Sequence, residues 1–332
     1  MDTQNLYNQV LKAINDNDDF LIISHANPDG DALGSQSALY QMLLLLKKNV
    51  IPVCKSELPY QYKFLPDYNK IKNDLAFARG EMNKYVSFCL DCADEYRMDI
   101  DFDEIKENSK LIINIDHHHN NTNFGDINII DAQKSATAEI LYDFISIFYK
   151  GIINSDIALG IYVGILTDTG NFQYSNTNYI VHGVVSELLK FDLDISKINK
   201  YIYESEPLER FKLIKLVLGR IGYVESSGLI YSYVLNKDFK QLNLPLSAQD
   251  GLIDLLRKAE KVRVAALIKQ VDKRKFKISL RTSDNNINLF EVANKFGGGG
   301  HKKASGYADK GRLGVVINNL KKSVECAIKN GS

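Results

Sequence analysis

Histidines and aspartates gather in four separate segments of the sequence. In chain order, the candidates are His25, Asp29, Asp31, Asp91, Asp116, His117, His118 and Asp168. Imidazole nitrogens and carboxylate oxygens without a required thiolate suit Mn²⁺ or Mg²⁺, whereas structural zinc more often recruits cysteine. The residue types therefore predict a site for divalent cations, with Mn²⁺ as the first expectation.

The number of carboxylates in this set points to more than one cation. Four or five carboxylates in one cleft would repel each other and raise their own pKa values, and bound divalent cations remove that repulsion. Two ions about 3.5 to 4 Å apart can share a bridging carboxylate, generate a hydroxide nucleophile near neutral pH and hold the phosphoryl oxygens of an in-line displacement. The donor set therefore predicts hydrolysis of a phosphoester.

The elements around these segments follow a strand–helix–strand pattern. Short apolar runs typical of buried parallel strands lie at 20–23, 50–54, 85–90 and 111–115, and helical periodicity lies at 3–17 and 35–48. Further helices are predicted at 137–149, 155–166 and 178–189. The first half is therefore expected to be a doubly wound α/β domain with a mainly parallel sheet. Three of the metal-ligand segments follow strands directly, so they converge on the carboxyl edge of that sheet, where ligands bind in such folds.

Each segment taken alone also has a simpler structural interpretation. The sequence ANPDGDA could be a solvated turn, Asp91 could be a helix N-cap, and Asp168 could mark the end of a helix. The run at 116–119 is harder to explain this way, because adjacent histidines beside an acid have little packing value. Cys89 and Cys92 form a CxxC with no second CxxC to complete a zinc ribbon, so we expect packed thiols, with redox regulation as the alternative.

The remainder of the chain predicts a second domain. We expect a first domain at 1–190, a helical linker at 191–224 and a smaller α+β domain at 225–332. In the last of these, strands are predicted at 229–235, 262–270 and 276–280.

The second domain contains a local excess of positive charge. Between Arg257 and Lys303 there are thirteen lysines and arginines against four acids, although the whole chain has 41 of each charge. Four consecutive glycines at 297–300 allow backbone amides to approach an anion closely, and His301 follows them. Such a face could hold one phosphate of a polyanion while metal ions cleave at another. A flexible glycine loop and a solvated charged hairpin are the simpler alternatives.

Taken together, these motifs resemble the four ordered motifs of the DHH phosphoesterase superfamily, which is named after the triplet found here at 116–118. The segment FGGGGHKKASG at 296–306 resembles the signature of the associated DHHA1 substrate domain. The two resemblances cover nearly the whole chain, and the short linker and the GGGGH motif make it most similar to the oligoribonuclease/pAp phosphatase (nanoRNase) branch.

The resemblance implies a role for each site residue. One metal ion would be held by His25, Asp29 and Asp91, and a second by Asp31, Asp91, His117 and Asp168, so that Asp91 bridges the two. His118 would contact the scissile phosphate or assist the leaving oxygen, and Asp116 would support the neighbouring imidazoles. The residues that the resemblance implies for substrate binding are Arg281, Gly298, Gly299, Gly300 and His301. The fourth residue of the DHHH run, His119, extends the family triplet and has no assigned role.

The function expected from this resemblance is hydrolysis of short oligonucleotides to 5′-mononucleotides and of pAp to AMP. Two Mn²⁺ ions would serve as cofactors, with Mg²⁺ or Co²⁺ as substitutes. The alternatives are a linear or cyclic dinucleotide phosphodiesterase, a RecJ-like long-strand exonuclease, an inorganic pyrophosphatase and, from another class, a nucleotide-binding sensor without turnover. Short RNA or DNA and pAp are the expected partners, and homodimerisation is left open.

Composition supports an ordinary globular protein. The chain has 332 residues, of which 45% are apolar and 25% charged, which excludes disordered and coiled-coil classes. Four cysteines are too few for a disulfide framework, the N-terminus lacks the apolar core of a signal peptide, and no apolar run approaches the ~20 residues of a membrane span. These features predict a cytoplasmic protein with no membrane partner.

Overall fold

A computed structural model describes residues 3–78 and 80–330 of the chain. The chain divides into two compact units, Met1–Ser205 and Glu206–Ser332. The unit boundary lies inside the segment 191–224 that was predicted as a linker, with one helix of that segment on each side.

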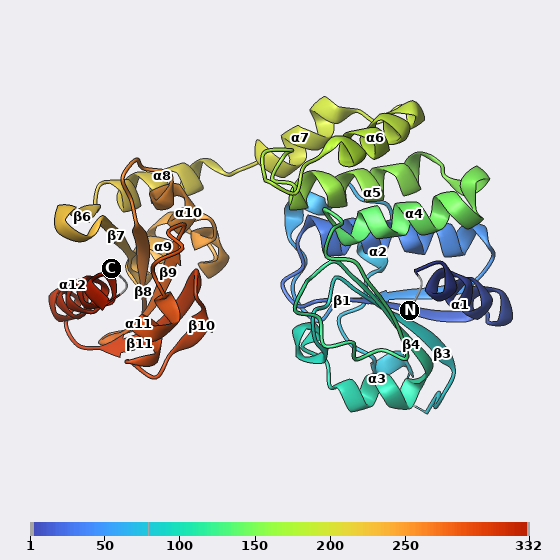
Figure 1. Cartoon of the computed structure of the whole chain (residues 1–332), viewed down its shortest axis with the longest axis horizontal. Coiled ribbons are helices and arrows are strands. Elements are labelled where there is room, and N and C mark those ends of the chain that lie inside the picture. The colour runs from blue at the N-terminus through green and yellow to red at the C-terminus, as the bar shows by residue number, and fades with distance from the viewer. Residues whose placement is uncertain (1–2, 79, 331–332) are drawn as a thin grey trace. The chain divides into compact units, whose positions relative to one another are not determined.

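The first unit is a sheet of five parallel strands with helices on both faces (Figure 1). The strand order is β2-β1-β3-β4-β5. Its elements are α1 (Thr3–Asp16), β1 (Asp19–Ser24), α2 (Gly30–Leu45), β2 (Asn49–Val53), β3 (Tyr85–Leu90), α3 (Phe102–Asn108), β4 (Ser109–Asp116), β5 (Ile127–Ile130), α4 (Thr137–Phe148), α5 (Ser155–Asp168), α6 (Tyr179–Leu188) and α7 (Ile195–Tyr203). This architecture confirms the predicted doubly wound α/β domain.

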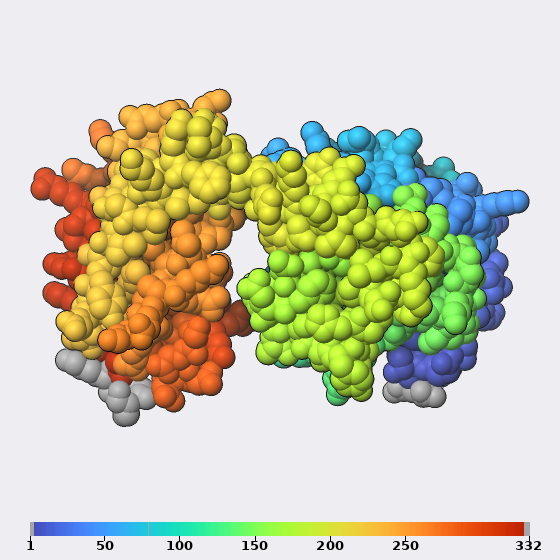
Figure 2. Space-filling view, turned by 90° about the horizontal axis from the view of Figure 1, so that it is seen from above, coloured from blue at the N-terminus to red at the C-terminus, as the bar shows by residue number. Residues whose placement is uncertain are grey.

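Alternating side chains of the buried strands form two cores, one on each face of the sheet. On β1, Phe20 and Ile22 pack with α1, α2, α4 and α5, whereas Leu21 and Ile23 pack with α3 on the other face. Both sets are fully buried, which explains why these strands are continuous apolar runs in the sequence. Helices α6 and α7 add a further layer, and Figure 2 shows their residues forming one surface of this unit.

Three glycines allow α2 and α5 to cross in direct contact. A Cβ atom at Gly34 would lie 2.4 Å from the carbonyl oxygen of Gly160, and a Cβ atom at Gly160 would lie 2.6 Å from that of Gly34. A Cβ atom at Gly164 would lie 2.7 Å from Oδ1 of Asp31. Because no side chain separates the two helices here, the first turn of α2 and the last turn of α5 lie side by side.

The helix predicted at 35–48 begins earlier than its periodicity indicates. Asp29 is the N-cap of α2, and its Oδ1 accepts hydrogen bonds from the backbone N–H groups of Asp31 and Ala32 at 3.0 and 3.1 Å. The sequence NPDGD is therefore partly the first turn of a helix and not wholly a loop. The apolar periodicity misses this turn because every residue from Gly30 to Leu43 is buried, the polar ones included.

The second unit is a six-stranded mixed sheet in the order β10-β11-β9-β8-β7-β6 (Figure 1). Its elements are α8 (Leu208–Leu218), β6 (Gly222–Val224), β7 (Leu229–Val234), α9 (Asn236–Leu242), α10 (Leu252–Arg257), β8 (Val264–Asp272), β9 (Lys275–Thr282), α11 (Leu289–Asn294), β10 (Gly299–His301), β11 (Ala304–Lys310) and α12 (Leu313–Asn330). The predicted strands are present as β7, β8 and β9, and the second domain is α+β as predicted. Helices α11 and α12 pack on one face of this sheet and α8, α9 and α10 on the other.

None of the helices in the described part of the chain is both long and apolar enough to cross a bilayer.

Candidate metal centre and anion site

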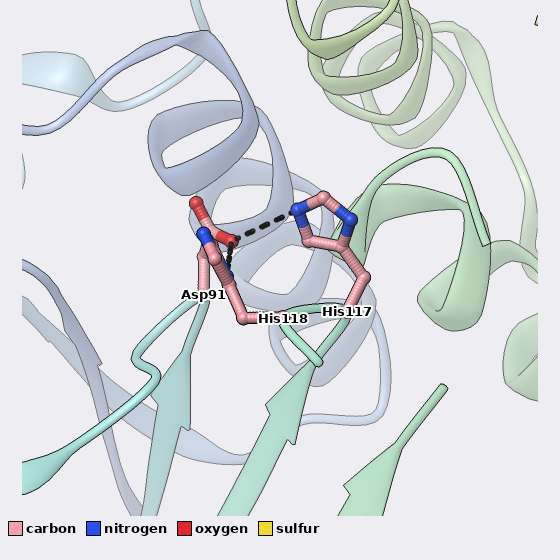
Figure 3. A group of neighbouring side chains, drawn as sticks. All are labelled: Asp91, His117 and His118. Carbon is pink, nitrogen blue, oxygen red and sulfur yellow. Dashed lines mark ion pairs between the residues drawn. The ribbon is translucent and has the colours of Figure 1, made fainter. Parts of the chain in front are cut away.

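The carboxyl ends of β1, β3 and β4 bring the predicted histidines and aspartates together. Asp91 follows β3 in a left-handed backbone conformation with φ of 58°, and its side chain is almost completely buried. Its Oδ2 lies 3.5 Å from Nε2 of His25, and its Oδ1 lies 3.7 Å from Nε2 of His117 and 3.5 Å from Nδ1 of His118. Figure 3 shows both imidazoles of the triplet beside this carboxylate. Asp91 is thus the centre of the cluster. Its Oδ2 faces His25, and its Oδ1 faces His117 and His118.

Two groups of ligand atoms share Asp91. One consists of His25, Asp29 and Asp91, and the other of Asp91, His117 and His118, and within each group the ligand atoms lie within 4.8 Å of one another. The last residue of α5, Asp168, extends the second group, because its Oδ2 lies 3.4 Å from Nε2 of His117. Every predicted metal-ligand segment therefore reaches the same place.

His25 is held in an orientation that leaves one ring nitrogen for a ligand. Nδ1 lies 2.9 Å from the carbonyl oxygen of Ala26, so this nitrogen donates to the backbone and Nε2 faces Asp91 and Asp29. Burial acts to lower the pKa of His25, but hydrogen bonds with Asp29 and Asp91 outweigh it and raise that pKa to about 10. The surrounding carboxylates therefore favour positive charge at this position.

Asp31 is buried beside other carboxylates and is held by a different helix. Its Oδ2 accepts from the backbone N–H of Thr137 at 2.6 Å, and its Oδ1 accepts from that of Ala138 at 3.0 Å. Burial, followed by repulsion from Asp91 and Asp168, raises the pKa of Asp31 well above its usual range. Burial likewise raises the pKa of Asp168 to about 6. These carboxylates together form a strongly electronegative site that a cation would neutralise.

A second network fixes the ring of His118. Nδ1 of His118 lies 2.7 Å from Oδ1 of Asp116, and Oδ2 of Asp116 accepts from Nδ2 of Asn121 at 2.6 Å. Asn121 also donates to the side chain of Asn114 at 2.8 Å. Asp116 is fully buried, and although burial opposes ionisation, the hydrogen bonds from His118 and Asn121 lower its pKa. The Asp116 carboxylate thus holds Nδ1 of His118 and leaves Nε2 available.

The residues that position the candidate ligands were not predicted from the sequence. Helix α4 has Ala136 at its N-cap and no capping side chain of its own, and Asp31 supplies the acceptor for its first N–H groups. The hydroxyl of Thr137 also donates to Oδ1 of Asp91 at 3.1 Å. The sequence did contain one signal of this contact. The helix predicted at 137–149 begins without Ser, Thr, Asp or Asn at its N-cap, so its first N–H groups need an acceptor from elsewhere in the fold.

The other residues singled out near this site lie outside the cluster. His119 is exposed to solvent. Cys89 and Cys92 are buried in the core beside α3, and burial raises the pKa of the Cys89 thiol to about 12. Buried thiols of raised pKa are chemically inert, which favours the packing interpretation of this CxxC.

The predicted substrate-binding residues lie at one edge of the second sheet. Ala304 on β11 pairs with Arg281 on β9 and with His301 on β10, so these three residues form one row across the sheet. Cross-strand partners point to the same face, and two strand spacings place Arg281 and His301 about 10 Å apart. His301 is exposed and Arg281 half-exposed.

Two of the four consecutive glycines at 297–300 are required for the pairing of β10 with β11. A Cβ atom at Gly298 would lie 2.3 Å from the carbonyl oxygen of Gly306, and one at Gly300 would lie 2.5 Å from that of Ala304. Gly300 also has φ of 131°, a conformation that favours glycine. By contrast, a Cβ atom at Gly299 would meet open space. Gly298 and Gly300 therefore let β10 pack against β11, whereas Gly299 within β10 and Gly297 before it present an open backbone.

Comparison with known proteins relates both units to described families. Residues 19–165 match the DHH family, N-terminal domain, and residues 227–327 match the DHHA1 domain. A protein of Thermus thermophilus named bifunctional oligoribonuclease and PAP phosphatase NrnA is 30% identical over 314 residues, which are 91% of this chain and 87% of that protein. The protein of the same name from Bacillus subtilis is 26% identical, with 90% and 91% covered. The crystal structure of an exopolyphosphatase-related protein from Bacteroides fragilis has a TM-score of 0.88 and 26% identity, covering 97% of this chain and 96% of that one.

Proposed function

Because the chain belongs to the DHH phosphoesterase family and carries a DHHA1 domain, we propose that it is a Mn²⁺-dependent enzyme that hydrolyses short oligonucleotides to 5′-mononucleotides and pAp to AMP. The observation that carries this proposal is the position of Asp91 between two sets of candidate ligands, with His25 facing one carboxylate oxygen and His117, which also faces Asp168, facing the other. The names of the relatives from Thermus thermophilus and Bacillus subtilis support the substrate class.

The residues present fit two divalent cations. His25, Asp29 and Asp91 would hold one ion, and Asp31, Asp91, His117 and Asp168 the other. The mixed imidazole and carboxylate donors suit Mn²⁺, with Mg²⁺ or Co²⁺ as substitutes. Burial, and after it repulsion from neighbouring carboxylates, raises the pKa values of Asp31 and Asp168, and bound cations would favour the ionised form of both. When bound, the pair supplies an activated water and charge neutralisation at the phosphoryl group.

The protein's own groups complete the reaction by positioning the substrate. With Nδ1 held by Asp116, His118 directs Nε2 toward the phosphoryl or leaving oxygen, to which it donates a hydrogen bond. In the second unit, Arg281 and His301 bind an anionic group of the substrate, and the open backbone at Gly299 lets that group approach closely. These contacts are expected to contribute mainly to substrate affinity.

A substrate panel tests the proposal with the purified full-length protein and Mn²⁺. The panel consists of pAp, a linear dinucleotide, a cyclic dinucleotide, pyrophosphate and a long single strand, with products separated by chromatography. We expect release of AMP from pAp and of 5′-mononucleotides from the dinucleotide. Equal degradation of the long strand would contradict the short-substrate assignment, and tight nucleotide binding without turnover would identify a sensor instead.

The bridging role of Asp91 is tested by metal content. Asp91→Ala is expected to lose both ions and nearly all turnover, whereas Asp103→Ala, which removes an exposed carboxylate on α3, is the matched control and should keep both. Mass spectrometry of the Mn²⁺ bound after desalting gives the readout. Normal metal content and normal turnover in Asp91→Ala would refute the bridged pair.

A further inference from the structure

The second sheet has a face that its helices cover only in part. Helices α8, α9 and α10 pack against buried residues of β7 and β8, which include Ile230, Ala265 and Leu267. Farther across the same face, the side chains of β9, β11 and β10 are exposed or half-exposed. We call this region the open strip, and its residues are Lys277, Ser279, Arg281, Ala304, Gly306 and His301.

One end of the open strip carries two lysines directly opposite each other. Lys277 on β9 is the cross-strand partner of Lys269 on β8. Like charges in this arrangement are destabilising. Burial lowers the pKa of Lys269, and repulsion from Lys277 lowers it further, although Asp250 acts in the opposite direction. The protein therefore maintains a repulsive pair at the surface.

Lys277 and Arg281 in the open strip, and Lys269 beside it, form no ion pair with any described residue, unlike Arg220 and Arg263 in the same unit. Arg220 pairs with Asp238, and Arg263 pairs with Asp284. Among the described residues, no carboxylate lies within 4.0 Å of the side-chain nitrogens of Lys269, Lys277 or Arg281. An external polyanion with phosphates spaced along it would pair with all three cations.

The small side chains between the cations make the strip accessible to a polymer backbone. Ser279, Ala304 and Gly306 form its floor between Lys277 and Arg281. These two cations are four residues apart on one strand and face the same side, so they lie about 13 Å apart along β9. This backbone span is longer than the separation of two phosphates carried by one ribose, so extended side chains at Lys277 and Arg281 match phosphates of different nucleotides better than the two phosphates of pAp.

We propose that Lys277, with Lys269 opposite it, binds the phosphate of an additional nucleotide in a single-stranded oligonucleotide whose other phosphate is bound at Arg281 and His301. The open strip thereby favours oligonucleotides over pAp. This inference rests on the proposed function for its substrate class, but the binding surface itself lies wholly within the second unit.

Salt-dependent binding of a fluorescent RNA pentamer tests the proposal. The full-length protein is titrated in EDTA, so that no hydrolysis occurs, at several KCl concentrations. Each phosphate contact on a single strand contributes about 0.7 to the slope of log K against log salt, which corresponds to about a five-fold change in affinity at 0.1 M salt. Lys277→Gln should lower the slope by about 0.7 and weaken binding about five-fold, and Lys269→Gln with Lys277→Gln should have a larger effect.

Matched variants separate this contact from general electrostatics. Lys322→Gln removes an exposed lysine from α12, which packs on the opposite face of the sheet, and it should bind the pentamer like the wild type. Lys277→Arg retains the charge and should restore most of the affinity. In Mn²⁺, the ratio of kcat/KM for the pentamer to kcat/KM for pAp should fall in Lys277→Gln.

The outcomes distinguish the surface from the enzyme activity. Identical affinity and slope in Lys277→Gln and Lys322→Gln would overturn the proposal, as would an equal loss for pentamer and pAp. If the wild type hydrolyses neither substrate yet binds the pentamer through Lys277, the proposed function fails and the binding surface stands. If it hydrolyses both without dependence on Lys277, the surface fails and the function stands.

Discussion

Replacing Gly164 by alanine should disturb the metal centre through the packing of two helices. The new Cβ atom would lie 2.4 Å from Cβ of Ala138 and 2.7 Å from Oδ1 of Asp31. Carbon atoms pack at about 3.5 to 4.0 Å, so α4 and α5 must separate by about 1 Å or Asp31 must move. Overpacking of this kind costs about 1 to 3 kcal/mol, which exceeds the gain of up to about 1 kcal/mol from replacing glycine within a helix.

The matched control is Gly183→Ala on α6, where a Cβ atom would meet no other atom within 4 Å. This control should be more stable than the wild type by about 0.5 to 1 kcal/mol, whereas Gly164→Ala should be less stable. Metal ligands must be held to within about 0.5 Å, so Gly164→Ala should also bind Mn²⁺ at least about ten-fold more weakly. Urea unfolding of the metal-free proteins and Mn²⁺ titration by electron paramagnetic resonance provide the measurements. If Gly164→Ala matched Gly183→Ala in stability and the wild type in Mn²⁺ affinity, the packing argument would be wrong.

Three further predictions concern separate parts of the molecule. Thr137→Val removes the hydroxyl that donates to Asp91 and should lower Mn²⁺ affinity about ten-fold, because a hydrogen bond to a charged group contributes about 1.5 to 3 kcal/mol. Thr137→Ser keeps the hydroxyl and should keep the affinity. Equal Mn²⁺ affinities in the two variants would contradict this role of Thr137. Arg220→Ala leaves Asp238 buried and unpaired, which should lower the free energy of unfolding by about 3 to 5 kcal/mol at neutral pH. Burial opposes ionisation of Asp238, but Arg220 lowers the pKa of Asp238 in the folded state. The stabilisation by this ion pair is therefore present above the unfolded pKa of about 3.9 and is lost as pH falls through the folded pKa. The unfolding curves of the wild type and Arg220→Ala should accordingly converge in acid. Mn²⁺ at 100 times its dissociation constant should stabilise the EDTA-treated protein by about 2.7 kcal/mol, and a melting temperature independent of Mn²⁺ would count against the metal centre.

Local patterns in the sequence predicted four of the five strands of the first sheet, all but β5, and the sheet edge at which its histidines and aspartates meet. A parallel strand buried on both faces must be a continuous apolar run, so β1, β3 and β4 were recognisable without any partner. Residues that follow such strands lie at the carboxyl edge of the sheet, and this rule predicts from the sequence that Asp91 and His117 lie close together. The sequence also contained the cationic segment of the second unit, although not its arrangement.

Tertiary structure alone decided which groups hold these side chains in place. Thr137 and Asp31 are 106 residues apart, and Gly34 meets Gly160 across two helices, so no local periodicity could reveal either contact. In the same way, only strand register places Arg281, His301 and Lys277 on one face, because a shift of one residue would turn each side chain to the opposite face. Chemistry that depends on residue type was therefore readable from the sequence, whereas positioning depends on contacts between distant segments and required the folded chain.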